Sequence, residues 1–178
     1  LLQLRPDDVH EWGIEKGRLW VRFNKTDILV KIATSFTDFN GAQRNLLAEI
    51  PHWDFDRTRA ELEAIWERQL NKIRILPLPH DGESLIDPQD SPLIRGFKGA
   101  LYHASFLPHV LNDVDGRYPG FAGTGIKQLP PSHYYYDDFS AWDTYRAQHP
   151  LLCILSPFES ADMMQSLVHK YQQGGWLP

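Results

Sequence analysis

The sequence predicts a mixed fold in which β-strands come first and α-helices follow. Apolar residues recur at every second position through the first forty residues, and at helical spacing after residue 41. Three prolines and a glycine within residues 76–90 mark a linker. We therefore divide the chain into residues 1–40, the end of a β-domain; residues 41–90, a linking helix and linker; and residues 91–178, the opening helices of an α-domain.

The first domain is expected to be a β-meander of three strands within residues 9–35. Residues 19–23 alternate between apolar and other side chains, as in a half-buried strand. Gly17 supplies the positive φ that a short turn between the first two strands needs. Three strands alone cannot bury both faces of a sheet, so we expect further strands before residue 1.

The spacing of apolar residues predicts helices near residues 56–72, 92–107, 139–148 and 157–173. Ser91 is expected to cap the second helix, and Pro150 to end the third near residue 149. Ser156 and Glu159 form the pattern of a capping box, and Gly175 is expected to stop the last helix.

Composition excludes several classes of protein. The net charge is −5 with interspersed signs, which argues against a nucleic-acid partner. Cys153 is the only cysteine, so neither a disulfide framework nor a cysteine metal site is expected, and its apolar neighbours predict a buried thiol. No stretch is long and apolar enough for a membrane span. The chain also contains no nucleophile elbow, phosphate-binding loop or dinucleotide fingerprint.

The first candidate site is the string from Asp113 to Arg117 in a Gly- and Pro-rich loop over residues 112–131. Asp113 and Asp115 stand at alternate positions before Gly116, as in a calcium loop, but the glutamate that closes an EF-hand is missing. The alternative is an Asx-turn whose carboxylates cap local N–H groups and pair with Arg117.

The second candidate is the group Trp142, Asp143 and Arg146, preceded by tyrosines at 134–136. A flat ring beside a carboxylate and a guanidinium suits a sugar, which stacks through its apolar face and hydrogen-bonds through its hydroxyls. The alternative is an intrahelical pair of Asp143 with Arg146 beside a core Trp142. Trp176, after a helix stop, lies either at a cleft rim or under a loop.

An ordered series of strings resembles glycoside hydrolase family 92. The strings occupy residues 45–51, 53–56, 100–103, 113–118, 139–146, 149–152 and 174–178. They follow the family's order and approximate spacing over residues 28–178, and it is the series that makes the resemblance specific.

The resemblance implies an N-terminal β-sandwich followed by an (α/α)6 barrel, of which this chain would be an internal part. It implies a calcium-dependent exo-α-mannosidase that removes terminal mannose from glycans of the N-glycan type with inversion, with Ca²⁺ as cofactor and mannose-containing glycans or glycoproteins as partners. The family's acid and base motifs do not occur here, so no catalytic residue is expected in the chain. The resemblance also favours a secreted or periplasmic location for the longer protein.

Carried over by position, Trp142 and Asp143 match the string that lines the pocket for the terminal mannose, and Arg146 is expected to orient Asp143. Trp176 is expected to contact substrate too. Asp113, Asp115 and Arg117 are possible loop contacts. The alternative is a non-catalytic carbohydrate-binding or structural protein with the same fold.

Overall fold

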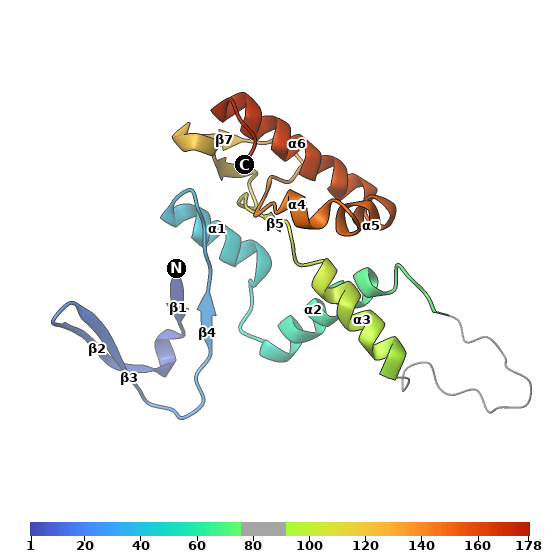
Figure 1. Cartoon of the computed structure of the whole chain (residues 1–178). Coiled ribbons are helices and arrows are strands. Elements are labelled where there is room, and N and C mark those ends of the chain that lie inside the picture. Colours follow the sequence, from blue (N-terminus) through green and yellow to red (C-terminus); the bar gives the residue numbers. More distant parts are fainter. Residues whose placement is uncertain (76–91) are drawn as a thin grey trace, which may run out of the picture.

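The computed structural model describes residues 1–75 and 92–178, and in them strands come first and helices dominate afterwards (Figure 1). The first strands are β1 (Leu2–Leu4), β2 (Val9–Glu15), β3 (Arg18–Phe23) and β4 (Val30–Ile32). Helices α1 (Phe39–Glu49), α2 (Phe55–Leu70) and α3 (Pro92–Ala104) follow. The rest comprises the short strands β5 (His109–Val110), β6 (Arg117–Pro119), β7 (Ile126–Gln128) and β8 (Tyr136–Asp137), then α4 (Ala141–Thr144), α5 (Gln148–Leu155) and α6 (Pro157–Gly174). The predicted mixed fold is confirmed, whereas the linker over residues 76–90 and the cap at Ser91 lie outside the described residues.

The N-terminal strands form two separate antiparallel pairs. Strands β2 and β3 make the expected hairpin, in which Lys16 (φ 49°) and Gly17 (φ 75°) form the two-residue turn. The expected meander is wrong, because β4 pairs with β1 and not with β3. The Asp8 carbonyl accepts from the Asn24 amide and its carboxylate from Lys25, which closes the base of the hairpin. The chain then continues to β4 beside β1, where Leu1 and Ala33 exchange backbone hydrogen bonds.

Helix α1 was not foreseen from the sequence. Its buried face consists of Gly41, Ala42 and Leu46, and its apolar period is as strong as that of α2, so the sequence does carry a helical signal there. The start of the helix is also well defined, because the Asp38 side chain accepts a hydrogen bond of 2.6 Å from the Gly41 amide.

Helices α2 and α3 lie close to their predicted bounds and pack through aromatic rings. The Trp66 ring lies 4.4 Å from Tyr102 and 5.9 Å from Phe106 between centroids. The apolar stripe predicted for α2 is only partly covered, since Leu62 and Ile65 are each 53% exposed.

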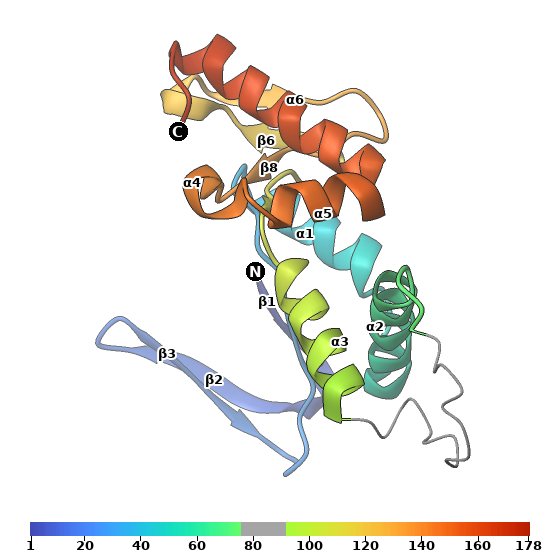
Figure 2. The same cartoon turned by 45° about the vertical axis from the view of Figure 1, so that its right-hand side comes forward.

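The predicted long loop over residues 112–131 is instead largely a hairpin of β6 and β7, and α6 packs beside it (Figure 2). Its core is formed by Tyr118, Leu129 and Tyr135, with the two tyrosine rings stacked at 4.0 Å. A second cluster of Tyr136, Leu152 and Met163 joins β8, α5 and α6.

Four predictions for the C-terminal helices were wrong. The helix expected at residues 139–148 is a single turn, α4. Pro150 does not end a helix but lies in the first turn of α5, where backbone N–H groups form no intrahelical hydrogen bonds, so proline is tolerated. Ser156 forms no side-chain cap, because its hydroxyl accepts from Lys72 Nζ at 2.6 Å. Cys153 is exposed and not buried. The stop at Gly175, with φ of 78°, is confirmed.

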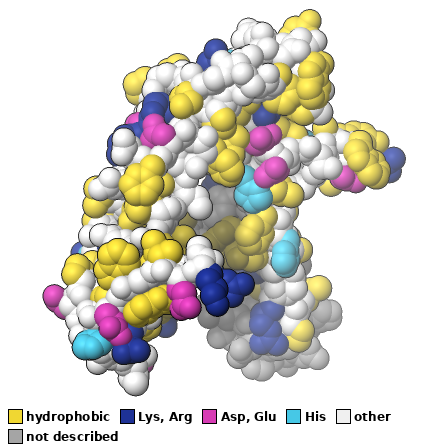
Figure 3. Space-filling model, turned by 90° about the vertical axis from the view of Figure 1, so that its left-hand side faces the viewer, with side chains coloured by type: hydrophobic (Ala, Val, Ile, Leu, Met, Phe, Trp, Pro, Cys, Tyr) yellow, Lys and Arg dark blue, Asp and Glu magenta, His cyan; other side chains and the backbone are white. Residues whose placement is uncertain are grey.

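Within residues 1–75 and 92–178, no helix combines the length and the apolar character that crossing a bilayer requires. On the face drawn in Figure 3, hydrophobic side chains are spread over much of the surface.

Replacement of Gly41 by alanine is expected to destabilise the protein. A Cβ there would lie 2.6 Å from Ser35 Oγ and would also press on the Asp113 carboxylate. Overpacking of this kind costs about 1–3 kcal/mol, which exceeds the helical preference of alanine over glycine, about 1 kcal/mol. The free energy of unfolding from urea titration measures the change. Gly99→Ala in α3 is the matched control, because a Cβ there meets no atom of the described residues within 4 Å, and it should be neutral or stabilising. Equal effects of the two variants would contradict the steric argument.

Candidate functional site

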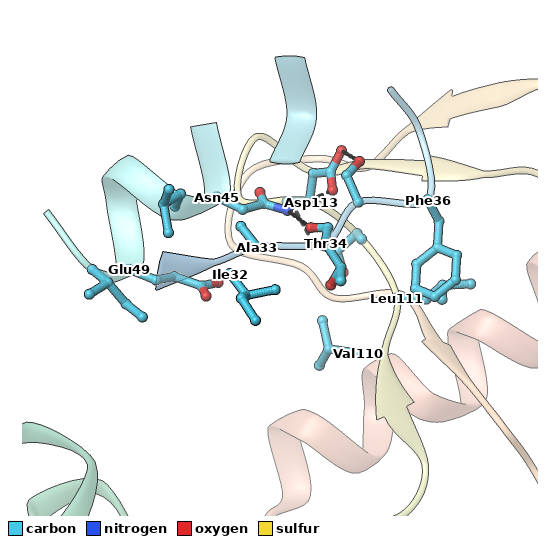
Figure 4. A pocket seen from close by; sticks show the side chains of 13 residues that line it. Ile32, Ala33, Thr34, Phe36, Asn45, Glu49, Val110, Leu111 and Asp113 are labelled. Atoms are coloured by element: carbon cyan, nitrogen blue, oxygen red, sulfur yellow. Dashed lines mark hydrogen bonds between the residues drawn. The ribbon is translucent and has the colours of Figure 1, made fainter. Parts of the chain in front are cut away.

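Asp113 is a buried anchor between two distant parts of the chain. Only 2% of the residue is exposed. Its carboxylate accepts a hydrogen bond from Thr37 Oγ1. It also accepts from Ser35 Oγ and from Asn45 Nδ2, each at 2.8 Å (Figure 4). The local Asx-turn predicted for this carboxylate is therefore wrong, because its side-chain partners lie 68 to 78 residues away.

Asn45 completes this junction from the side of α1. Its amide nitrogen also donates to the Thr34 carbonyl at 2.9 Å, and its amide oxygen accepts from the Val114 N–H at 3.0 Å. One side chain thus joins α1, the segment before it and the residue after Asp113.

A pocket of about 290 Å³ borders this junction (Figure 4). Ile32, Val110 and Leu111 form part of its wall, and Glu49 is an exposed polar group in it. The polar side chains of Asp113 and Asn45 in the wall already bond to each other. The pocket therefore presents few free polar groups to a ligand, and we do not assign it a substrate.

Asp115 and Arg117 belong to a charged network over the same junction. Arg117 donates to Asp115 Oδ2 at 3.0 Å and to Asp38 Oδ2 at 2.8 Å, and its backbone N–H bonds to Asp115 Oδ1. Arg44 Nε lies 3.0 Å from Asp115, an ion-pair distance without the geometry of a hydrogen bond. The hydrogen bond from Arg117 lowers the pKa of Asp38, which favours the ionised form. The predicted pairing of Asp115 with Arg117 is confirmed.

The described residues contain no cluster of metal-binding side chains. No group of three or more His, Cys, Asp or Glu side chains in residues 1–75 and 92–178 could hold a metal ion together. Asp113 and Asp115 are engaged by protein donors, so the calcium-loop interpretation of this string is not supported.

The second candidate group is carried by α4. Trp142 is 80% exposed, so the alternative that buried it in the core is wrong. Asp143 is also exposed and accepts a hydrogen bond of 2.5 Å from Ser140 Oγ. Arg146 was expected to contact Asp143 but does not. Its Nε instead donates to the neighbouring Tyr145 hydroxyl at 2.8 Å. Neither an ion pair of Asp143 with Arg146 nor the proposed orienting contact forms in this structure.

Trp176 lies just after α6, against the β6–β7 hairpin. Its ring packs edge-on against Phe121 at 4.7 Å, and it remains 55% exposed. Gln173 fixes this contact, because its side-chain oxygen accepts from the Phe121 N–H at 2.7 Å. Both views place the C-terminal end of the chain on the same side of the molecule as α4 (Figures 1 and 2). The segments that carry the exposed Trp142 and Trp176, α4 and the end of the chain, thus lie in one region.

An ion pair of a buried lysine, which the sequence did not reveal, supports this region. Lys170 is 1% exposed, and its Nζ donates to Asp137 Oδ1 at 2.7 Å. The same ammonium lies 4.6 Å from the ring of Tyr135 and 5.2 Å from that of Phe121. The only sequence signal is a lysine on the helix face that carries Met163.

The three consecutive tyrosines divide between core and surface. Tyr135 and Tyr136 are buried, and burial raises the pKa of Tyr136 to about 12. Tyr134 alone is exposed. The tyrosines before α4 therefore serve mainly packing, and the flat surface available to a ligand comes from the tryptophans.

Comparison with known protein families identifies the class as glycoside hydrolases. Residues 41–178 match the model described as "Glycosyl hydrolase family 92 catalytic domain". This match covers more than half of the chain, and the chain belongs to glycosyl hydrolase family 92.

Solved structures of family members share the fold. The family GH92 alpha-mannosidase BT3965 from Bacteroides thetaiotaomicron is 28% identical with a TM-score of 0.66, over 85% of this chain and 18% of that chain. The same values hold for BT3965 in complex with mannoimidazole. The family GH92 inverting mannosidase BT2199 from the same organism has a TM-score of 0.78 at 21% identity, over 99% of this chain and 25% of that one. The chain thus spans a quarter or less of these relatives. Among curated protein sequences, no significant match was found.

The Asp113 anchor is expected to matter far more for stability than the neighbouring ion pair. Asp113→Asn replaces one acceptor oxygen by an NH₂ group that faces the hydroxyls of Ser35 and Thr37. Leaving buried donors without an acceptor costs about 1–3 kcal/mol, so the free energy of unfolding should fall by roughly that amount. Asp115→Asn is the control, with an expected loss below about 1 kcal/mol because its partners are partly exposed. Chemical denaturation of both variants measures the difference. A loss for Asp115→Asn as large as for Asp113→Asn would contradict the anchor.

Proposed function

We propose that this chain forms part of an inverting exo-α-mannosidase that removes terminal α-mannose from glycans of the N-glycan type. The observation that carries the proposal is the match of residues 41–178 to the family 92 catalytic domain. The 28% identity with an enzyme named as an alpha-mannosidase supports it further. In this proposal the strands β1 to β4 end a β-sandwich, and the helices from α3 onward open an (α/α)6 barrel.

The proposed substrate contacts lie on α4 and at the end of α6. The exposed ring of Trp142 offers a surface on which the apolar face of a pyranose stacks. Asp143 accepts hydrogen bonds from sugar hydroxyls, and Trp176 borders the same region. Arg146 contributes a guanidinium beside them, directed by its hydrogen bond to Tyr145.

Hydrolysis with inversion requires a general acid and a general base separated by enough space for a water molecule. The carboxylates near α4 are engaged elsewhere: Asp137 by Lys170, and Asp138 by His109 at 2.8 Å. Asp113 and Asp115 are engaged at the α1 junction. We therefore place the acid and the base in parts of the enzyme outside this chain, and any calcium ligands outside the described residues.

The 178-residue chain by itself is expected not to hydrolyse aryl or disaccharide α-mannosides. General acid–base catalysis alone contributes roughly 10²–10⁴-fold to such a reaction, and the groups that would supply it are not assigned to this chain. Release of p-nitrophenol from an aryl α-mannoside measures the activity, with the longer family protein as positive control. Turnover by the isolated chain that disappears on mutation of one of its own carboxylates would refute the placement of the acid and base.

In the complete enzyme, Asp143→Asn is expected to lower kcat/KM by about ten- to a hundredfold with an unchanged Tm. Hydrogen bonds to a charged group contribute about 1.5–3 kcal/mol, and about 1.4 kcal/mol corresponds to a factor of ten. The variant keeps the shape of the side chain but removes the negative charge that strengthens its hydrogen bonds with the sugar hydroxyls. Asp56→Asn is the matched control, because Asp56 is also an exposed carboxylate in the first turn of a helix, α2.

Wild-type kinetics for Asp143→Asn would remove Asp143 from the substrate site. A complete protein that binds mannosides in a saturable way without turnover would instead favour a carbohydrate-binding protein over an enzyme.

A further inference from the structure

Ser140, the residue before α4, uses its hydroxyl in an unusual way. A serine at this position of a helix ordinarily accepts a hydrogen bond from a backbone N–H in the first turn. Here the side chain forms no such cap, and its hydroxyl donates to the Asp143 carboxylate at 2.5 Å. The hydroxyl therefore acts on the side chain of Asp143 and not on the helix backbone.

The backbone of Ser140 is held independently of its hydroxyl. Its carbonyl oxygen accepts from the Asp143 N–H at 3.0 Å, and from both the N–H and the hydroxyl of Thr144, at 3.1 and 3.0 Å. Removal of the Ser140 hydroxyl leaves all three of these bonds in place. A change at this side chain should thus affect Asp143 without unfolding the turn.

The contact divides the two oxygens of the Asp143 carboxylate. Oδ2 is occupied by Ser140, whereas Oδ1 accepts no hydrogen bond from the residues that the structure describes. An exposed carboxylate without such a partner samples several rotamers, and ordering it lowers ligand affinity. Arg146 does not order it, because within the described residues it forms no hydrogen bond or ion pair with Asp143, and its Nε is bonded to Tyr145.

We propose that Ser140 is a positioning residue for the sugar site: it fixes Asp143 in one rotamer and leaves Oδ1 free for a hydroxyl of the substrate. This inference rests on the proposed function, in which Asp143 binds the sugar. It adds to the site a residue whose own side chain touches no substrate.

The test is the kinetics of Ser140 variants of the complete enzyme on an aryl α-mannoside. Ser140→Ala should lower kcat/KM about three- to tenfold, the size expected for losing the pre-ordering of one side chain. Ser140→Thr keeps the hydroxyl and should restore most of the rate. The Tm should stay unchanged in both variants. A rate that Ser140→Thr fails to restore, or a rate loss accompanied by a lower Tm, would overturn the proposal.

Ser140→Asp separates positioning from helix capping. Aspartate is as good a helix cap as serine, so a capping role predicts normal stability and normal kinetics for this variant. A positioning role predicts a lower kcat/KM, because a second carboxylate repels Asp143 and cannot donate a hydrogen bond to it. Its kcat/KM should fall below that of Ser140→Ala, and normal kinetics would overturn the proposal.

A double-mutant cycle distinguishes failure of this inference from failure of the proposed function. In the Asp143→Ala background there is no carboxylate to hold, so Ser140→Ala should cause no further loss. A full additional loss would overturn positioning through Asp143. If Asp143→Asn lowers kcat/KM while Ser140→Ala does not, the positioning role is wrong and the proposed function stands. If Asp143→Asn has no effect, the assignment of Asp143 to the sugar site fails first.

Discussion

The buried carboxylate of Asp113 is the contact on which the arrangement of the two halves depends. Burying a charge costs several kcal/mol, and three hydrogen bonds of about 1.5–3 kcal/mol each offset that cost only when all of them form. Such a contact therefore favours one arrangement of the chain over others more than it adds to the overall stability. It requires Ser35, Thr37 and Asn45 at once, and Gly41 is needed because any side chain there would enter the same space. The position of α1 against the later loop thus depends on this carboxylate, together with the bonds of Asn45 with Val114 and of Arg117 with Asp38.

The C-terminal half depends on a second buried charge. Lys170 reaches from α6 to Asp137 on β8, between the rings of Tyr135 and Phe121. Phe121 in turn supports Trp176, and Asp137 lies three residues before Ser140. The two segments with exposed tryptophans are therefore both connected to a single ammonium group. A rigid support of this kind lets side chains at the surface keep a defined geometry while they remain accessible to a ligand.

The sequence predicted those elements whose signal is local. The structure confirms the β2–β3 turn, the bounds of α2 and α6, and the helix stop at Gly175. The spacing of apolar residues predicted the two helices, and the positive φ that glycine adopts predicted the turn and the stop. The prediction missed α1, although its apolar residues recur at helical spacing, and it missed the separation of α4 from α5. Of the candidate site, it predicted the pairing of Asp115 with Arg117 but not the partners of Asp113. Contacts between residues about 70 positions apart leave no periodic signal in the chain, so no local pattern could have revealed them.

The difference between Asp113 and Asp143 shows how environment assigns roles to identical side chains. Each accepts a hydrogen bond from a serine. Asp113 is surrounded by three donors and is closed to solvent, so a ligand could reach it only by breaking the junction. Asp143 has one donor, stands beside an exposed indole and retains an oxygen without a partner in the described part of the chain. A carboxylate can serve a ligand only if the fold leaves some of its hydrogen-bonding capacity unused, and of these two only Asp143 meets that condition.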